Sequence, residues 1–314
     1  MKNKLFILAL SGLILLGGLS FAGGTQEAAD QAAEISVGLL PDVDSIPFVL
    51  AEINGYYEEE GVKVSLKQFK SPVDRDTAFQ AGETKAVISD LLATALSVNG
   101  GFKVKAVSLT NGSYKLLVKP DSDVNSIADL KGQGLGISKN TIIEYATDKM
   151  LRTGGLSDSD IKKEIIPQIP VRLEMLQTGK IDGATLAEPL ATISVLAGCS
   201  VLISTDKLGI NPGIMLIDED FLAGNKASVT AMYRAYNRAV DYINSTPKSE
   251  YIDAVIEAMG FPPAAKEVME LPAYTKAQAP PADEAAEVVS WLYNRELISK
   301  EFSYDELIDS SCLP

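Results

Sequence analysis

The amino-acid sequence predicts a two-lobed α/β protein in which each lobe is a mostly parallel sheet flanked by helices. Short apolar runs alternate with helical segments, which is typical of parallel sheets covered on both faces. The 314 residues are enough for about two domains. A pattern at residues 80–94 returns at 177–192, which indicates that two lobes are built in a related way.

The first lobe is expected to alternate strands with helices. Its predicted strands are 35–40, 62–69, 86–90 and 104–110. Its predicted helices are 48–57, 73–81 and 91–100, the last ending at Gly100-Gly101. Apolar residues dominate each strand, so we expect all four strands to be buried.

The second lobe repeats this alternation. Its predicted strands are 115–120, 134–138, 164–168, 182–186 and 200–205. Its predicted helices are 127–132, the helix that begins at Thr141, 171–179 and 189–198. Thr141 is followed three residues later by Glu144, which indicates a capping box, and Gly154-Gly155 ends that helix.

After residue 211 one strand, 213–218, is followed almost entirely by helices. The predicted helices are 226–246, 248–259, 263–270, 283–297 and 304–310. Such a tail cannot form a sheet of its own, so we expect it to pack on the first lobe. Lobe 1 is then discontinuous, with residues 34–116 and 210–314, and lobe 2 spans 117–209. The two chain crossings near 113–118 and 206–213 would act as the hinge.

The N-terminus has the layout of a secretory signal peptide. Lys2 and Lys4 precede an apolar run at 5–16, and small residues stand at Ser20 and Ala22. We expect cleavage after Ala22 and a flexible leader at 23–33, because the apolar run is shorter than a membrane span. No Cys stands at the cleavage point. The mature protein is therefore expected outside the cytoplasmic membrane.

Composition excludes several kinds of chemistry. The formal net charge is −14, which disfavours nucleic acids and anionic lipids as partners. The chain has no His and two Cys, so Ser-His-Asp and Cys-His catalysis and the usual zinc sites are excluded. We expect no cofactor and no metal. Cys199 and Cys312 leave a disulfide open, since sequence cannot place them within bonding distance.

The internal repeat suggests a pair of carboxylates. Both copies read Gln-x-Gly, an apolar strand, an acid and Leu-Ala-Thr, which places Asp90 opposite Glu188. Each acid can simply cap the following helix. The alternative is that both face a cleft, because ligands of open parallel sheets bind beyond the carboxyl ends of the strands.

The same rule selects polar residues in the other loops at that edge. Together with the two acids of the repeat, the candidate ligand-binding residues are Asp42, Asp44, Ser45, Asp90, Thr110, Asn111, Lys139, Asn140, Thr141 and Glu188, and Asn211 lies at the second chain crossing. The helix that starts at Thr141 also offers free backbone N–H groups to an anion or a carbonyl oxygen.

Three segments carry a resemblance to a known family. ISVGLLPDVDSIPFVLAEINGYYEEEGVKV, SIADLKGQGLGIS and LQTGKIDGATLAEPLA resemble type II periplasmic solute-binding proteins of ABC importers. The nitrate/sulfonate/taurine and thiamine-pyrimidine-precursor binding family is the most similar. The resemblance covers nearly the whole mature chain. It implies two α/β lobes that close like a hinge on a small solute and deliver it to a membrane permease. It also implies ligand contacts at the first loop, at Glu188, and at the Ser89-Asp90 and Ser138–Thr141 segments, which adds Ser89 and Ser138 to the candidates. We expect a monomer, since the solute must reach the cleft and each lobe must move.

The charges in these loops suggest a class of solute. Lys139 is the only cation among the candidate residues, against four acids, and Arg75 and Arg172 are expected on the surface of helices. We therefore expect a neutral or cationic nitrogen-containing solute. A nitrate-, sulfonate- or taurine-type anion is the alternative, as is a sensory binding protein. An enzyme of this fold is disfavoured by the export signal, and the lack of His argues against the pyrimidine synthesis of the family's eukaryotic relative.

Overall fold

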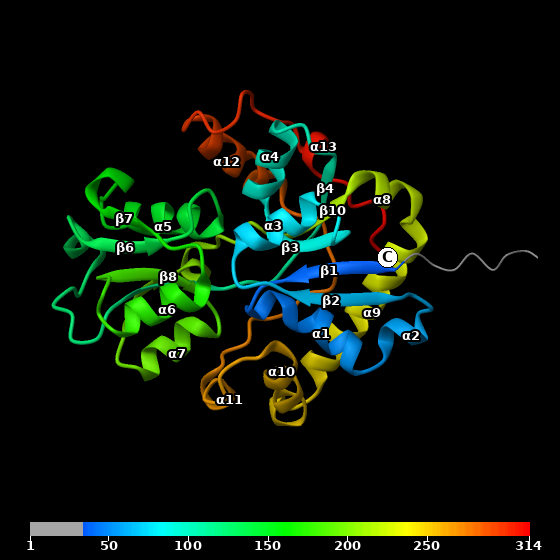
Figure 1. The fold of residues 1–314 in the computed structure, drawn as a ribbon, viewed down its shortest axis with the longest axis horizontal. Coiled ribbons are helices and arrows are strands. Elements are labelled where there is room, and N and C mark those ends of the chain that lie inside the picture. Colours follow the sequence, from blue (N-terminus) through cyan, green and yellow to red (C-terminus); the bar gives the residue numbers. More distant parts are fainter. Residues whose placement is uncertain (1–33) are drawn as a thin grey trace, which may run out of the picture. The chain divides into compact units, whose positions relative to one another are not determined.

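The computed structural model describes residues 34–314 (Figure 1). The predicted signal peptide at 1–22 and leader at 23–33 lie outside the described residues. Within 34–314, every helix is too short or too polar to cross a membrane.

The first sheet contains five strands in the order β2-β1-β3-β10-β4 (Figure 1). They are β2 (Val64–Gln68), β1 (Ile35–Leu39), β3 (Ala86–Asp90), β10 (Gly213–Asp218) and β4 (Val104–Leu109). β10 runs antiparallel to both of its neighbours, while β1 is parallel to β2 and β3. The carboxyl ends of β1, β3 and β4 therefore share one edge.

The second sheet has the same construction, in the order β7-β6-β8-β5-β9. Its strands are β7 (Lys162–Ile165), β6 (Gly134–Ile137), β8 (Gly183–Ala187), β5 (Tyr114–Val118) and β9 (Ser200–Ser204). β5 is antiparallel to β8 and β9, and β6 is parallel to β7 and β8. The reversed strand of each sheet, β10 or β5, is the first strand after the chain crosses from the other sheet.

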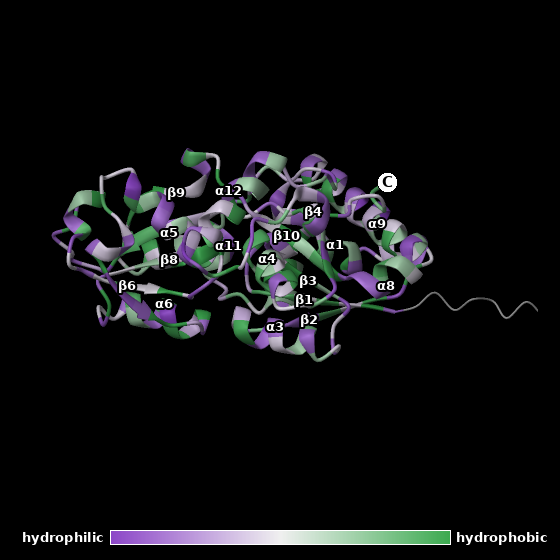
Figure 2. Cartoon of the chain, turned by 90° about the horizontal axis from the view of Figure 1, so that it is seen from above, coloured by the Kyte–Doolittle hydropathy of each residue, from purple (hydrophilic) through white to green (hydrophobic). Residues whose placement is uncertain are grey.

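Helices cover both faces of the first sheet. On one face lie α1 (Ile46–Ile53), α2 (Tyr56–Glu59), α9 (Lys226–Ser245), α10 (Ile252–Met259) and α11 (Ala265–Val268). On the other lie α3 (Pro72–Gln80), α4 (Leu91–Asn99), α12 (Ala282–Tyr293) and α13 (Tyr304–Leu307). α8 (Glu219–Gly224) follows β10 directly. Figure 2 shows hydrophobic residues along these strands, whereas the helices carry both hydrophobic and hydrophilic residues.

The second sheet is covered by α5 (Ile142–Arg152), α6 (Ile169–Gln177) and α7 (Leu190–Leu196). α5 packs in one apolar cluster with Leu116 and Leu135, whereas α6 and α7 pack in another with Leu117 and Ala184. Short 3₁₀ turns complete the chain at Val43–Ser45, Ile127–Leu130, Asp158–Asp160, Thr205–Leu208 and Lys248–Glu250. We call each sheet with its helices a lobe.

The observed elements follow the predicted order, with a few differences in extent. The helix expected over 48–57 is divided at Gly55, which has the left-handed φ of 71° that favours glycine. The helix expected from 248 begins at Ile252, after a 3₁₀ turn. The expected division between lobes after residue 116 falls inside β5. Cys199 and Cys312 are both free and lie in different apolar clusters.

Gly183 allows a test of how tightly the second sheet is packed. A Cβ at this position would lie 2.7 Å from both the Leu117 carbonyl oxygen and Leu135 Cδ2. We expect Gly183→Ala to lower the free energy of unfolding by about 1–3 kcal/mol, because a paired strand cannot move aside without strain. Urea unfolding of the chain from residue 23 onward measures this.

Gly224→Ala is the matched control, since a Cβ there meets no atom within 4 Å. Gly224 ends α8, so alanine should leave stability unchanged or raise it by up to about 1 kcal/mol. Equal unfolding midpoints for wild type and Gly183→Ala would contradict this account of the packing.

Candidate ligand-binding site

A cavity lies where the two lobes meet, at the carboxyl ends of β1, β3 and β8. It contains about 530 Å³ of empty space, part of which is open to solvent. Polar or charged side chains and an apolar wall line it together. The lining residues are Leu40, Pro41, Asp42, Pro72, Arg75, Ile88, Ser89, Asp90, Tyr114, Ile142, Ile143, Ile169, Arg172 and Ala187. Both lobes thus contribute walls.

Asp42 reaches the cavity from the loop after β1. Its Oδ1 accepts a hydrogen bond from Ser45 Oγ at 2.9 Å, and its side chain is buried. Burial, and then the nearby Asp44 carboxylate, raise the pKa of Asp42 well above its usual range. This carboxyl is therefore shifted toward its neutral form, in which it can donate a hydrogen bond.

Asp90 ends β3 and contacts a helix of each lobe. Its Oδ1 accepts a hydrogen bond from Ala93 N at 2.8 Å, which caps α4, and its Oδ2 accepts one from Ile142 N at 3.1 Å, the first residue of α5. Burial raises the pKa of Asp90, while Arg75 and the two N–H donors lower it. The carboxylate joins the lobes directly at the cavity. Beside it, Ser89 Oγ is buried and has no hydrogen-bond partner in the part of the chain that the structure describes.

Arg75 comes from α3, which begins after the cap residue Ser71. Its Nε and Nη2 both lie 2.8 Å from Asp76 Oδ1, and its Nη1 donates to the Ile88 carbonyl at 2.9 Å. The side chain is only 2% exposed. Its charge is thus balanced by the adjacent carboxylate.

Arg172, on α6 of the second lobe, is a buried cation of a different kind. It is 1% exposed, its Nη1 donates to the Ile166 carbonyl at 2.7 Å, and its Nε is buried with no hydrogen-bond partner among the described residues. Within residues 34–314 no carboxylate forms an ion pair with it. Burial lowers its pKa to about 10, so the guanidinium stays charged at neutral pH.

The expectation that Arg75 and Arg172 lie on the surface is wrong. Both are buried and line the cavity, because α3 and α6 flank it from opposite lobes. Gly136 on β6 has no side chain and so leaves room for Arg172, whose Cγ lies 3.2 Å from where a Cβ would stand. Lys139, expected as the one cation of the site, is exposed and lies outside the cavity. Since two arginines line the cavity, the charge argument for a cationic solute loses its premise.

Of the predicted residues, the cavity brings together Asp42, Ser89 and Asp90. The others lie elsewhere: Asp44, Ser45, Thr110, Asn111, Ser138, Lys139, Asn140, Thr141, Glu188 and Asn211. Lys139, Asn140 and Thr141 border a separate surface depression together with Val73 and Phe102. Sequence reasoning missed Arg75, Arg172, Tyr114 and the apolar wall of the cavity.

Glu188 directly follows β8, whereas Asp90 is the last residue of β3, so the repeat places the two acids at matching strand ends, but Glu188 does not line the cavity. Both strands are third in their sheets. Glu188 accepts hydrogen bonds from Thr192 N at 3.1 Å and Thr192 Oγ1 at 2.8 Å, and it forms an ion pair with Lys115. Its carboxylate therefore caps α7, as the capping interpretation expects.

Asp44 is buried where the two chain crossings meet. Its carboxylate packs against Gly112 of one crossing and Gly213 of the other. Asn211 Nδ2 donates to the Thr110 carbonyl at 2.6 Å and so ties the crossings together. Burial raises the pKa of Asp44 to about 6, although the hydroxyls of Thr110 and Tyr114 lower it.

Asp44 gives a prediction about stability and pH. Its carboxyl titrates near 6 in the folded chain and near 3.8 when unfolded, so the folded state binds more protons and loses stability as the pH rises through this interval. We expect Asp44→Asn to be more stable than wild type at pH 7.5, by up to about 3 kcal/mol. The difference should shrink as the pH is lowered to 4.5. Urea unfolding over this pH range measures it.

Asp220→Asn is the control, because Asp220 is largely exposed and only pairs with Lys103. It should leave the pH dependence unchanged. An Asp44→Asn variant that is less stable than wild type at pH 7.5 would show that the carboxylate is needed in its charged form.

Comparison with known proteins agrees with this arrangement. A putatively assigned relative from Brachyspira hyodysenteriae, named as an ABC transporter periplasmic binding protein, is 23% identical over 258 residues, covering 76% of this chain and 74% of its own. A 4-amino-5-hydroxymethyl-2-methylpyrimidine phosphate synthase of Saccharomyces cerevisiae is 22% identical over 238 residues, 66% of each chain. The crystal structure of the periplasmic aliphatic sulphonate binding protein of Escherichia coli has a TM-score of 0.73 at 18% identity, covering 88% of this chain and 92% of that one.

The solved structure establishes the likeness of fold, and the sequence relatives include binding proteins and synthases. The model of the NMT1/THI5-like family matches residues 42–250, which include the cavity residues from Asp42 to Ala187. This match extends over more than half of the chain. The chain therefore belongs to the NMT1/THI5-like family.

Proposed function

We propose that the chain captures a small organic anion in the interlobe cavity and delivers it to a membrane permease. The relative from Brachyspira hyodysenteriae is named as a periplasmic binding protein of an ABC transporter, which supports the permease as partner. The signal-peptide pattern at residues 1–22 supports export. The chain would work as a monomer, since the cavity must open to receive the solute.

We choose an anion because of the surroundings of Arg172. A guanidinium that is 1% exposed and has no carboxylate partner in the described chain has lost its hydration without a compensating charge. A sulfonate or carboxylate group of a solute in the cavity would supply that charge and accept hydrogen bonds from its free N–H groups.

The other charged groups of the cavity do not require a cationic solute. Asp90 is already bonded to the N–H groups of two helices, and Arg75 is paired with Asp76. The raised pKa of Asp42 reduces its negative charge. Arg172 is thus the group whose charge is left uncompensated.

The apolar wall suits a solute with a carbon body. Ile88 and Leu40 from the first lobe face the cavity together with Ile142, Ile143 and Ile169 from the second. Binding between these surfaces removes apolar area of both lobes from water, at roughly 25 cal/mol per Å². A solute that contacts both lobes therefore favours their closure, which is how a binding protein retains its ligand.

Two alternatives remain as outcomes of the test. The synthase from Saccharomyces cerevisiae is a relative, but the chain has no His for acid–base chemistry, so we propose binding without turnover. A nitrogen-containing heterocycle is the other alternative, because Asp42 could bond to its ring or amino nitrogen.

Arg172→Met tests the proposal. The mature chain is unfolded and refolded to remove bound solute, then screened by thermal shift against alkanesulfonates, nitrate and carboxylates, and against aminopyrimidines and polyamines. We expect the wild type to respond to an anion, with about 2.7 kcal/mol of added stability at 100 times the dissociation constant. Arg172→Met should lose this response while its solute-free form melts no lower than wild type, since an unpaired buried charge is removed.

Arg152→Met is the control, because Arg152 is exposed on α5. It should keep the full response. A response of the wild type to the nitrogenous compounds alone would overturn the choice of an anion, and chemical conversion of a bound compound would overturn binding without turnover.

A further inference from the structure

Away from the cavity, helices α5 and α12 form a second contact between the lobes. α5 packs on β5, β6 and β8, and α12 packs on α4 of the first lobe. The Tyr145 ring of α5 meets the Trp291 ring of α12 nearly at right angles, with centroids 5.6 Å apart. Both side chains are buried. The exposed edge of this contact holds an ion pair between Lys149 and Glu287.

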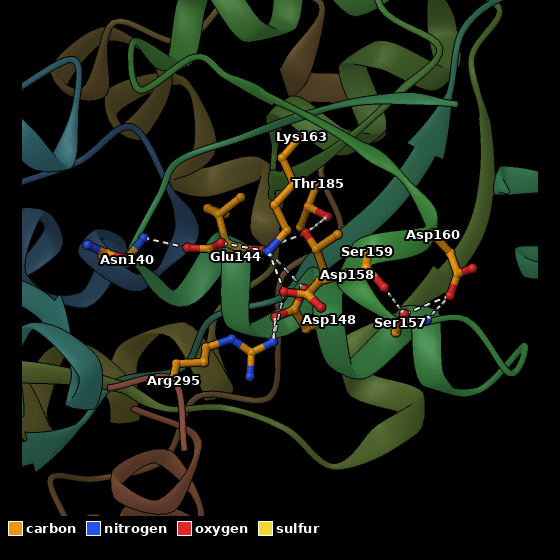
Figure 3. A network of polar contacts seen from close by, with 12 residues as sticks. Asn140, Glu144, Asp148, Ser157, Asp158, Ser159, Asp160, Lys163, Thr185 and Arg295 are labelled. Atoms are coloured by element: carbon orange, nitrogen blue, oxygen red, sulfur yellow. Dashed lines mark hydrogen bonds and ion pairs between the residues drawn. The ribbon is translucent and has the colours of Figure 1, made fainter. Parts of the chain in front are cut away.

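Arg295, just after α12, joins this contact to a cluster of acids in the second lobe (Figure 3). Its Nη2 lies 2.5 Å from Asp148 Oδ2 and 3.3 Å from Asp158 Oδ2. Its guanidinium also lies over the Trp291 ring, 4.1 Å from the centroid. Arg295 therefore contacts acids of the second lobe and the Trp291 ring of the first lobe at the same time.

The acid cluster needs a cation from outside its own lobe. Glu144, Asp148 and Asp158 share one lysine of the second lobe, Lys163, at 2.7, 3.5 and 3.3 Å. Asp148 is only 2% exposed. Arg295 is the second cation, and it comes from the first lobe. If α5 moved away from α12, three carboxylates would face a single lysine, one of them in a buried position.

The same helix forms a wall of the cavity. Ile142 and Ile143 of its first turn line the cavity, and Ile142 N–H donates to Asp90 at 3.1 Å. Tyr145 and Asp148 follow on the next turns. The position of the cavity wall therefore depends on how α5 is held along its length.

We propose that Arg295 is a positioning residue that holds α5 against α12 and so favours the closed arrangement of the lobes before any solute binds. The effect of Arg295 on how long a solute stays bound rests on the proposed function. Its effect on the arrangement of the solute-free lobes does not.

Arg295→Gln tests this inference on the solute-free mature chain. Small-angle X-ray scattering should give a larger radius of gyration than for wild type, and the backbone amides of α5 should exchange faster with deuterium. If an alkanesulfonate probe binds the wild type, its dissociation rate from the variant should be about tenfold higher, the effect of ~1.4 kcal/mol. Arg295→Lys keeps the charge and should restore most of the compaction.

Arg238→Gln is the matched control. Arg238 lies 4.3 Å over the Tyr56 ring and pairs with Glu59 and Glu60, all within the first lobe. It should change neither the scattering nor the exchange in α5. Equal scattering and exchange for Arg295→Gln and wild type would overturn the inference, as would an equal effect of Arg238→Gln. A wild type that shows no response to the alkanesulfonate probe would contradict the proposed function. The scattering and exchange measurements would still test the role of Arg295.

Discussion

The Asp90 carboxylate is the contact on which the cavity depends. One oxygen satisfies the first turn of α4 and the other the first residue of α5, so a single side chain serves helix ends that belong to different lobes. Helix ends leave backbone N–H groups without partners, and a carboxylate there gains from the helix dipole as well. The adjoining contacts reinforce it, since Val43 N donates to the Glu188 carbonyl and Ile169 N to the Lys70 carbonyl, each at 3.0 Å. The cavity walls are thus held by hydrogen bonds that cross between the lobes.

The order of strands and helices could be predicted from sequence because it depends on local signals. Apolar runs set the strands, and the glycine pairs mark helix ends. The repeat also predicted that Asp90 and Glu188 stand in equivalent places, and each lies at the carboxyl end of the third strand of its sheet, Asp90 as its last residue and Glu188 directly after it. The two residues have equivalent positions in the backbone, but their side chains have different neighbours. Glu188 lies beside Lys115, whereas Asp90 faces α5 of the other lobe, and neither neighbour is near in sequence.

The two arginines could not be predicted because their burial depends on the packing of the lobes. A charged residue on a helix is usually exposed, and nothing beside Arg172 in the sequence indicates otherwise. Its place depends on Gly136, which lies 36 residues earlier and leaves room above β6. Arg75 does have a local signal, the adjacent Asp76 that balances its charge. The same Asp-Arg-Asp run at 74–76 fits an exposed helix face equally well, so sequence cannot distinguish the two.

Arg172 and Arg295 show two opposite uses of charge: Arg172 is buried, whereas Arg295 is half-buried beside the buried Asp148. Within residues 34–314, Arg172 has no counter-charge, which costs stability; under the proposed function, a solute brings the missing charge and gains a strong interaction. Arg295 supplies a counter-charge across the lobes to acids that would otherwise outnumber their cations. Under the two proposals above, the first arrangement favours the cavity with a solute bound, and the second keeps its walls together before a solute binds. A binding protein needs both, because a cavity that opened fully without solute would lose part of the binding energy to closing it again.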